Sequence, residues 1–303
     1  MSLYRDTVSQ LSALYPTGEA TALARMLFEE RFGLSQTDLL LGKDSNLSAD
    51  DLKEVQDIVA RLLKNEPMQY ILGYTDFCGL RIGVAPGVLI PRPETQELVE
   101  WIVEAKDEMP APQRLEAEKT HVLDIGTGSG CIALALASKG YDVEAWDVSK
   151  EALRIAQANA ESLGLSVHFE QKDILQISST RPHSSSPSII VSNPPYICQH
   201  EAADMERNVL DHEPPIALFV PDNDPLLFYR AIARFAQHNL KPGGFIYFEI
   251  NRAYNHETKF MLEQEGFVDI ELRNDQFGNP RMMKATKPHT QPNHEGRRAN
   301  YEL

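Results

Sequence analysis

The first 73 residues carry apolar side chains at the spacing of α-helices. From Ser48 to Pro67 they recur every three or four residues, and Ser48 is suited to cap the first turn of such a helix. Residues 20–34 have the same character and end beside Gly33, a residue common just after a helix. We therefore predict a small helical domain over residues 1–73, of the kind that docks a partner or braces a catalytic domain.

The pattern changes after this helical domain. Residues 74–90 form short β-prone pieces punctuated by glycines, as in a hairpin that links two domains. Over residues 91–287, apolar strand-like runs alternate with amphipathic helical runs, which predicts an α/β domain of βαβ units on a mostly parallel sheet. Residues 288–303 are polar and lack periodicity, so we predict a disordered tail there.

Composition narrows the class of protein. The 303 residues hold 29 Lys and Arg against 44 Asp and Glu, and the resulting charge of −15 opposes nucleic-acid binding and suits a basic partner. Solubility alone is an alternative explanation of this charge. The three cysteines lack the spacing of a disulfide framework or a zinc ribbon. Because the N-terminus has no signal-peptide core and no apolar run reaches about 20 residues, we expect a cytoplasmic protein without a membrane segment.

A strand-like run over residues 121–125 leads into a glycine-rich turn and then a helical run. Glycines there allow a ligand close to the backbone, and the helix N-terminus offers free N–H groups. The spacing is G-x-G-x-G, whereas the dinucleotide fingerprint would need its third glycine at Cys131. The motif resembles that of class I S-adenosylmethionine methyltransferases, which implies a Rossmann-like, mostly parallel seven-stranded sheet and this cofactor. The candidate cofactor-binding residues are Asp124, Gly126, Thr127, Gly128, Ser129 and Gly130.

The ends of the next two strand-like runs carry further candidate cofactor contacts. Asp147 follows Gly126 by about 20 residues, where a doubly wound fold places a carboxylate on the ribose hydroxyls. A carboxylate that caps a turn is the alternative, and the register with the glycine turn favours the ribose contact. The resemblance to the same methyltransferase class implies that Asp173 and Ile174 contact the adenine, as an acceptor and as an apolar wall.

A fourth strand-like run ends in Asn193, Pro194, Pro195 and Tyr196, which are the candidate catalytic residues. Prolines lack the N–H donor of a sheet ladder, so the strand must end there, at the edge where doubly wound sheets bind ligands. The Asn193 side-chain oxygen and the Pro194 carbonyl can each accept one hydrogen of a planar –NH₂ group and orient its nitrogen toward an activated methyl group. The Tyr196 ring either packs against this group or fills the core.

Taken together, the motifs resemble the HemK/PrmC family of release factor glutamine N5-methyltransferases. Further matches are EPMQYILG at residues 66–73, LIPRPET at residues 89–95 and HEP at residues 212–214, so the resemblance covers nearly the whole chain. It implies methylation of the glutamine in the GGQ motif of peptide chain release factors by a monomer whose helical domain docks this substrate. It also places Asn193 near the methionine end of the cofactor.

Two residues depart from the family pattern. Gln96 stands where the family usually has Glu, and Ile174 stands where some members have an aromatic residue. These departures affect only the details of linker contacts and adenine packing. Arg92 and Glu94 are expected to join the linker to the catalytic domain, and Phe77 is either a pocket wall or a core aromatic.

Other functions remain as alternatives. The motif from Asn193 to Tyr196 alone also suits methylation of adenine N6 or cytosine N4 in nucleic acid, whereas LIPRPET after a helical domain favours a protein substrate. A non-catalytic binder with the cofactor fold is a third hypothesis, which the intact motif opposes. Cys198, His200 and His212 match no standard zinc spacing, so we predict no metal site.

Overall fold

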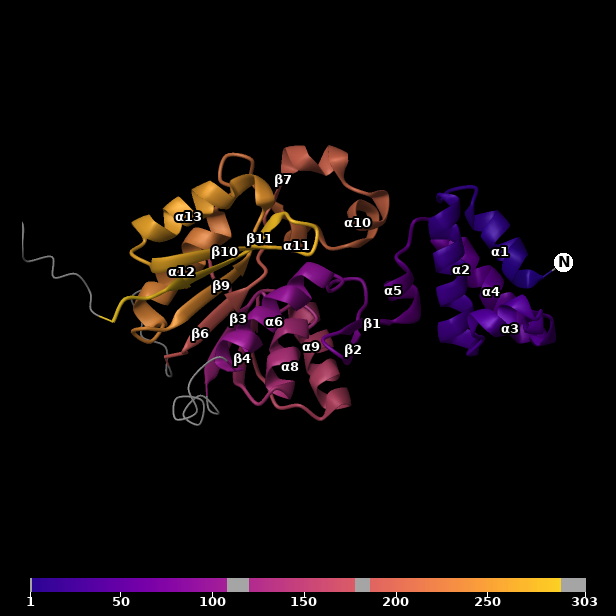
Figure 1. The fold of residues 1–303 in the computed structure, drawn as a ribbon, viewed down its shortest axis with the longest axis horizontal. Helices are drawn as coiled ribbons and strands as arrows, with labels where there is room; N and C mark the ends of the chain where they lie inside the picture. The colour runs from indigo at the N-terminus through magenta and orange to yellow at the C-terminus, as the bar shows by residue number, and fades with distance from the viewer. Residues whose placement is uncertain (1, 108–119, 178–185, 290–303) are drawn as a thin grey trace, which may run out of the picture.

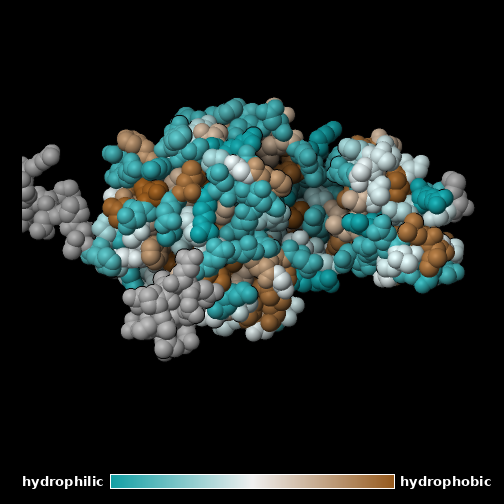
Figure 2. All heavy atoms as spheres, in the orientation of Figure 1, coloured by the Kyte–Doolittle hydropathy of each residue, from teal (hydrophilic) through white to brown (hydrophobic). Residues whose placement is uncertain are grey.

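A computed structural model describes residues 2–107, 120–177 and 186–289. A group of helices lies at one end of the long axis and an α/β unit occupies the rest of the molecule (Figure 1). Residues 290–303, which make up most of the predicted tail, lie outside the described residues. The face of the molecule seen in Figure 2 is mostly hydrophilic, with small apolar patches.

The helical end has its own core. Ser48 caps α4 through a reciprocal capping box with Asp51, as the sequence predicts for Ser48. Gly33 ends α2 in the left-handed conformation, at φ 64°, which also agrees with the prediction. Buried Phe28 and Leu62 are among the residues that hold the helices together. The elements are α1 (Leu3–Leu11), α2 (Thr17–Phe32), α3 (Gln36–Leu40), the 3-10 helix η1 (Lys43–Asn46), α4 (Ala49–Leu62) and α5 (Met68–Leu72).

A two-stranded antiparallel hairpin follows, formed by β1 (Tyr74–Phe77) and β2 (Leu80–Gly83). Phe77 is 2% exposed and belongs to the same buried cluster as Val122 of the sheet, so its ring is a core aromatic. The next element is a helix, α6 (Pro93–Asp107), which the sequence analysis did not predict. Its proline-rich start reads as a loop, although Pro is well tolerated in the first turn of a helix.

The α/β unit contains a seven-stranded sheet in the order β10-β11-β9-β6-β3-β4-β5. The strands from β9 to β5 in this order run parallel, and β11 pairs antiparallel with both β9 and β10. The predicted Rossmann-like, mostly parallel fold with a helical N-terminal region is thus confirmed. The strands are β3 (His121–Ile125), β4 (Asp142–Asp147), β5 (His168–Gln171), β6 (Ile189–Ser192), β9 (Phe245–Glu249), β10 (Val268–Asn274) and β11 (Pro280–Thr286).

Helices cover both faces of this sheet (Figure 1). Val122 packs with α6, α8 (Cys131–Ser138) and α9 (Lys150–Leu163), whereas its neighbour Leu123 packs with α12 (Leu227–Asn239) and α13 (Asn255–Gln264), as the alternation along a strand requires. None of the described helices is long and apolar enough to cross a membrane. The connecting elements are β7 (Ile197–Cys198), η2 (Gln199–Asp204), α10 (Arg207–His212), α11 (Pro215–Leu218), β8 (Phe219–Val220) and η3 (Arg252–Tyr254).

Candidate active site

A cavity of about 330 Å³ opens at the carboxyl ends of the parallel strands. Open α/β sheets bind their ligands at this edge. The cavity brings together most of the residues that the sequence analysis selected from four separate strand ends. These residues are Gly126, Thr127, Gly128, Ser129, Asp147, Asp173, Ile174, Asn193, Pro194 and Pro195.

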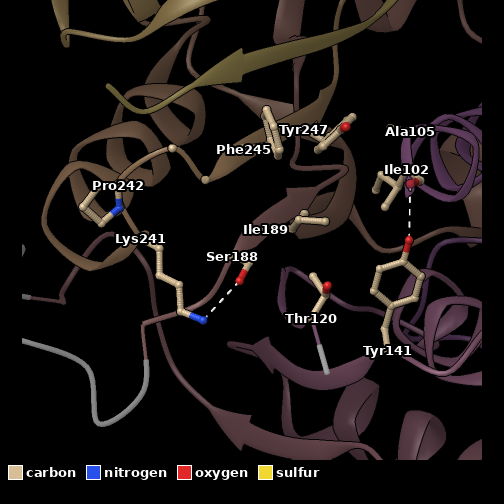
Figure 3. A pocket seen from close by; sticks show the side chains of 12 residues that line it. Ile102, Ala105, Thr120, Tyr141, Ser188, Ile189, Lys241, Pro242, Phe245 and Tyr247 are labelled. Atoms are coloured by element: carbon tan, nitrogen blue, oxygen red, sulfur yellow. Dashed lines mark hydrogen bonds between the residues drawn. The ribbon is translucent and has the colours of Figure 1, made fainter. Parts of the chain in front are cut away.

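A smaller cavity of about 180 Å³ lies near the amino ends of β6 and β9, at the opposite edge (Figure 3). Here Lys241 donates to the Ser188 hydroxyl at 3.2 Å, and Tyr141 donates to the Ile102 carbonyl at 3.3 Å. Among the described residues that line this cavity, Lys241 is the charged one, and the lining holds no residue of the predicted site. The candidate active site is therefore the cavity at the carboxyl edge.

The glycines after β3 divide into two roles. Gly126 and Gly128 adopt φ values of 79° and 57°, and a Cβ atom on either would meet no heavy atom within 4 Å. They leave an open cradle of backbone on the cavity side of the turn. At Gly130, which is not part of the lining, a Cβ would lie 3.0 Å from the Ala156 Cβ, so this glycine allows α8 to pack closely against α9.

Asp147 lies beside this cradle at the end of β4. Its carboxylate accepts the Gly128 N–H at 2.9 Å and the Ser149 N–H at 2.8 Å. Burial raises the pKa of Asp147, while these backbone donors oppose the rise. The carboxylate therefore organises the turn, and its remaining lone pairs can accept hydroxyl groups of a ligand.

Asp124 lies underneath the turn and does not line the cavity. It is fully buried and accepts the Thr127 hydroxyl at 2.6 Å. Burial raises the pKa of Asp124 to about 7, with the Thr127 hydrogen bond opposing and the nearby Asp147 reinforcing the rise. Asp124 therefore supports the glycine-rich turn through its hydrogen bond with Thr127 and does not contact the cavity. Asp173, by contrast, lines the cavity and also accepts the Leu175 N–H at 3.0 Å.

The residues from Asn193 to Tyr196 separate into two groups. Asn193, Pro194 and Pro195 line the cavity, and the Asn193 Nδ2 donates to the Thr95 hydroxyl at 3.1 Å. Tyr196 is not part of the lining, because its ring packs on the core between the sheet and α12. Its hydroxyl donates to Glu249 at 3.0 Å. The geometry thus gives Tyr196 an anchoring position and leaves the Asn193 oxygen as an acceptor.

Part of the cavity wall comes from segments that the sequence analysis did not select. The segment after the hairpin contributes Val88 and Leu89, the first turn of α6 contributes Thr95, and the lining also includes Ile216 and Phe228. The sequence signal that could have pointed to Thr95 is the LIPRPET stretch, because Thr95 is a polar residue on an otherwise apolar side of α6. Its place at the cavity depends on how the linker folds back over the sheet edge.

Arg92 joins the linker to the segment that follows the reactive motif. Its guanidinium contacts the buried Glu213 carboxylate at 2.5 Å, and Glu213 also accepts the Ile90 N–H at 3.1 Å. Glu94 lies near Arg281, whose pKa is raised because surrounding acidic groups outweigh the effect of burial. The histidine His212 binds the Lys64 carbonyl at 3.0 Å, whereas Cys198 and His200 lie near Asp222.

The fold and the cavity together define a class I S-adenosylmethionine-dependent methyltransferase. The open cradle at Gly126 and Gly128, the carboxylate of Asp147 and the adjoining apolar wall fit the polar and aromatic parts of this cofactor. Two solved structures share the fold. A human methyltransferase 10 domain containing protein has a TM-score of 0.51 and 16% identity, covering 70% of this chain and 90% of that one. The T. thermophilus 16S rRNA N2 G1207 methyltransferase has a TM-score of 0.50 and 20% identity, covering 71% and 49%.

Sequence comparison identifies the family. Residues 2–73 match the PrmC N-terminal domain, and residues 111–214 match the methyltransferase small domain. The release factor glutamine methyltransferase of Bacteroides thetaiotaomicron is 47% identical over 91% of this chain and 96% of its own length. That of Flavobacterium psychrophilum is 41% identical over 91% and 95%. The chain belongs to the family of release factor glutamine methyltransferases, which confirms the resemblance seen in the motifs.

Proposed function

We propose that this enzyme methylates the side-chain nitrogen of the glutamine in the GGQ motif of peptide chain release factors. The observation that carries the proposal is the placement of Asn193 on the cavity with its amide nitrogen bound to Thr95. This leaves the side-chain oxygen to accept a hydrogen from an incoming –NH₂ group. The similarity to relatives named release factor glutamine methyltransferases supports the same substrate.

The cavity residues are proposed to hold S-adenosylmethionine as follows. The backbone of Gly126, Thr127, Gly128 and Ser129, supported by Asp124 and Gly130, cradles the cofactor. Asp147 accepts the ribose hydroxyls, and Asp173 and Ile174 flank the adenine. Asn193 contacts the methionine end. The cofactor, when bound, supplies an already activated methyl group, so the protein needs no nucleophile or metal of its own.

Asn193 and Pro194 are proposed to assist attack by the glutamine nitrogen, which is the remaining difficulty of the reaction. The lone pair of a planar amide nitrogen is delocalised, so the nitrogen is a poor nucleophile. The Asn193 oxygen and the Pro194 carbonyl, which has no ladder partner beyond the strand end, each accept one hydrogen of the glutamine –NH₂ group. Both bonds orient the nitrogen and strengthen as positive charge develops on it. The nitrogen–carbon bond would form as the bond between the methyl group and the cofactor sulfur breaks, and one of the two nitrogen protons would then be lost to water. Pro195 keeps the backbone out of the sheet, and Tyr196 anchors the motif.

Replacing Asp147 by alanine is expected to weaken cofactor binding by about tenfold or more, because the variant loses an acceptor for the ligand and two backbone donors lose their partner. Calorimetric titration with S-adenosylmethionine measures the affinity. Asp142→Ala, at the exposed start of the same strand, is the matched control and should bind normally. A folded Asp147→Ala protein with wild-type affinity would contradict the assignment.

The substrate is tested by incubating the enzyme with methyl-labelled cofactor and either an intact release factor, a short GGQ peptide, tRNA or DNA. We expect label on the GGQ glutamine of the intact factor and little on the peptide, because remote contacts help to orient the reacting group. The charge of −15 suits a basic protein partner, so rising salt should slow the reaction. Label on adenine or cytosine with none on the release factor would reverse the assignment in favour of a nucleic-acid methyltransferase.

The partner is proposed to be a protein alone, without direct contact to nucleic acid, and the enzyme is proposed to act as a monomer in the cytoplasm. The helical part formed by residues 1–73 is proposed to dock the release factor, residues 74–90 to link it, and residues 91–287 to carry catalysis. This division is supported by the match of residues 2–73 to the PrmC N-terminal domain.

A further inference from the structure

Two buried polar residues are linked to Asn193, Thr95 directly and Glu249 through Thr95. Thr95, in the first turn of α6, is 2% exposed, and Glu249, at the end of β9, is 1% exposed. Thr95 has entered the chemistry so far only as the partner of the Asn193 amide nitrogen, and Glu249 has no role in it. A carboxylate in such a place is costly unless its oxygens are well bonded, so its partners indicate what it does.

Glu249 connects to both ends of the reactive motif. Its Oε2 accepts the Thr95 hydroxyl at 2.6 Å, and Thr95 in turn accepts the Asn193 Nδ2 hydrogen at 3.1 Å. Its Oε1 accepts the Tyr196 hydroxyl at 3.0 Å. One carboxylate therefore holds Asn193 through Thr95 and holds Tyr196 directly. The three hydrogen bonds join residues that are 154, 98 and 53 positions apart in the sequence, so they exist only in the folded chain.

The hydrogen bonds from Asn193 to Thr95 and from Thr95 to Glu249 determine which way the Asn193 side-chain amide points. An ionised carboxylate only accepts hydrogen bonds, and a threonine hydroxyl has a single proton to donate. Since Thr95 gives that proton to Glu249, its oxygen can only accept from Asn193. The amide must turn its nitrogen toward Thr95 and its oxygen away. The reversed amide would place two acceptors face to face and leave both unsatisfied.

The groups around Glu249 act on its ionisation in opposite directions. The half-buried Arg281 is a nearby cation, and Glu94 on α6 is a nearby acid. Burial raises the pKa of Glu249, whereas the hydroxyls of Thr95 and Tyr196 and the charge of Arg281 oppose that rise. Thr95 and Tyr196, which order the motif, therefore also favour the ionised form of Glu249, together with Arg281.

We propose that Glu249, acting through Thr95, sets the direction of the Asn193 amide so that this residue presents an acceptor, and so selects methyl acceptors that offer an –NH₂ group. The inference rests on the proposed function of Asn193. Thr95 and Glu249 are positioning residues, since they act on the substrate only through Asn193. The LIPRPET stretch thereby gains a role in catalysis through its threonine.

The test begins with Thr95→Val, which keeps the shape and removes the hydroxyl. With intact release factor and saturating cofactor, kcat is expected to fall about tenfold to a hundredfold, as for lost supporting partners at other sites, while the Kd for the cofactor stays within about twofold. Thr95→Ser should restore most of kcat because it keeps the hydroxyl. Thr258→Val is the matched control: this threonine is also buried and bonds a carbonyl at 2.7 Å, but on α13, and its loss should leave kcat unchanged.

Combining Thr95→Val with Asn193→Ala separates positioning from general damage. If Thr95 acts through Asn193, the double variant turns over no more slowly than Asn193→Ala alone, whereas independent effects would multiply. Glu249→Gln places an amide that also donates where only acceptors stood, and it should lower kcat by a similar factor. It serves as the second variant if Thr95→Val does not fold.

A measurement without substrate completes the test. In protein labelled with ¹⁵N-asparagine, the Asn193 side-chain NH₂ signal, assigned by its loss in Asn193→Ala, should show one proton protected from solvent exchange. Protection should vanish in Thr95→Val and persist in Thr258→Val. Unchanged protection and kcat in Thr95→Val, or multiplying effects in the double variant, would overturn the inference. If the Asn193 proton is protected as expected but the enzyme transfers no methyl group to glutamine, the inference about Thr95 and Glu249 is supported and the proposed function is refuted.

Discussion

Replacing Asn193 by alanine is expected to lower the turnover number by about 10²- to 10³-fold, the range seen when one preorganised polar partner is removed from a reacting centre. The variant loses the side-chain oxygen that orients the glutamine nitrogen, whereas the Pro194 carbonyl remains. Because Asn193 provides only part of the cavity wall, cofactor affinity should fall much less than turnover. Turnover is measured with intact release factor and saturating labelled cofactor.

Asn255→Ala is the control for this experiment. Asn255 is also half-buried and bonds the Arg252 carbonyl, but it lies at the start of α13, away from the cavity. Its loss should leave both turnover and cofactor affinity unchanged. Near-normal turnover in a folded Asn193→Ala enzyme would remove this residue from the mechanism.

The strand ends of the site were predictable from sequence because each carries a local signal. Gly126 and Gly128 follow an apolar run, and Asn193 stands before two prolines that must end a strand. Parallel strands then bring their carboxyl ends to one edge, so residues far apart in sequence meet in one cavity. The seven-stranded sheet was predictable in the same way, from the alternation of strand-like and helical runs.

The support behind the site was not predictable, since it depends on contacts across the chain. Glu249 ends an apolar strand and looks like an ordinary polar stop, and only the packing of α6 against β9 brings Thr95 to it. Tyr196 shows the same limit. Its place in the motif favoured a ring against the substrate, whereas the structure turns its hydroxyl to Glu249. Short motifs indicate which residues gather, and packing decides which of them reach the cavity.

The pair formed by Arg92 and Glu213 offers a test of how the linker is held. The Glu213 side chain is 1% exposed and that of Arg92 is 32% exposed, so the two partners differ in their access to water. Losing Arg92 leaves an unpaired carboxylate in the interior. Losing the charge of Glu213 leaves a guanidinium that can still turn to solvent. The two single variants should therefore differ, although they break the same contact.

Arg92→Met is expected to lower the free energy of unfolding by about 2–4 kcal/mol, near the cost of stranding a buried charge. Glu213→Gln should cost about 1–2 kcal/mol, because its amide oxygen can still accept the Ile90 N–H and Arg92 keeps its contact with water. The double variant should cost less than the two single effects combined, since no uncompensated charge remains. Urea titration without cofactor measures the free energy of unfolding of all three variants.

Arg207→Met, which breaks an exposed pair with Asp211, is the control and should change stability by no more than about 0.5 kcal/mol. Equal costs for the two single variants would show that the carboxylate of Glu213 is not confined to the interior, and the linker would then be held by apolar packing alone.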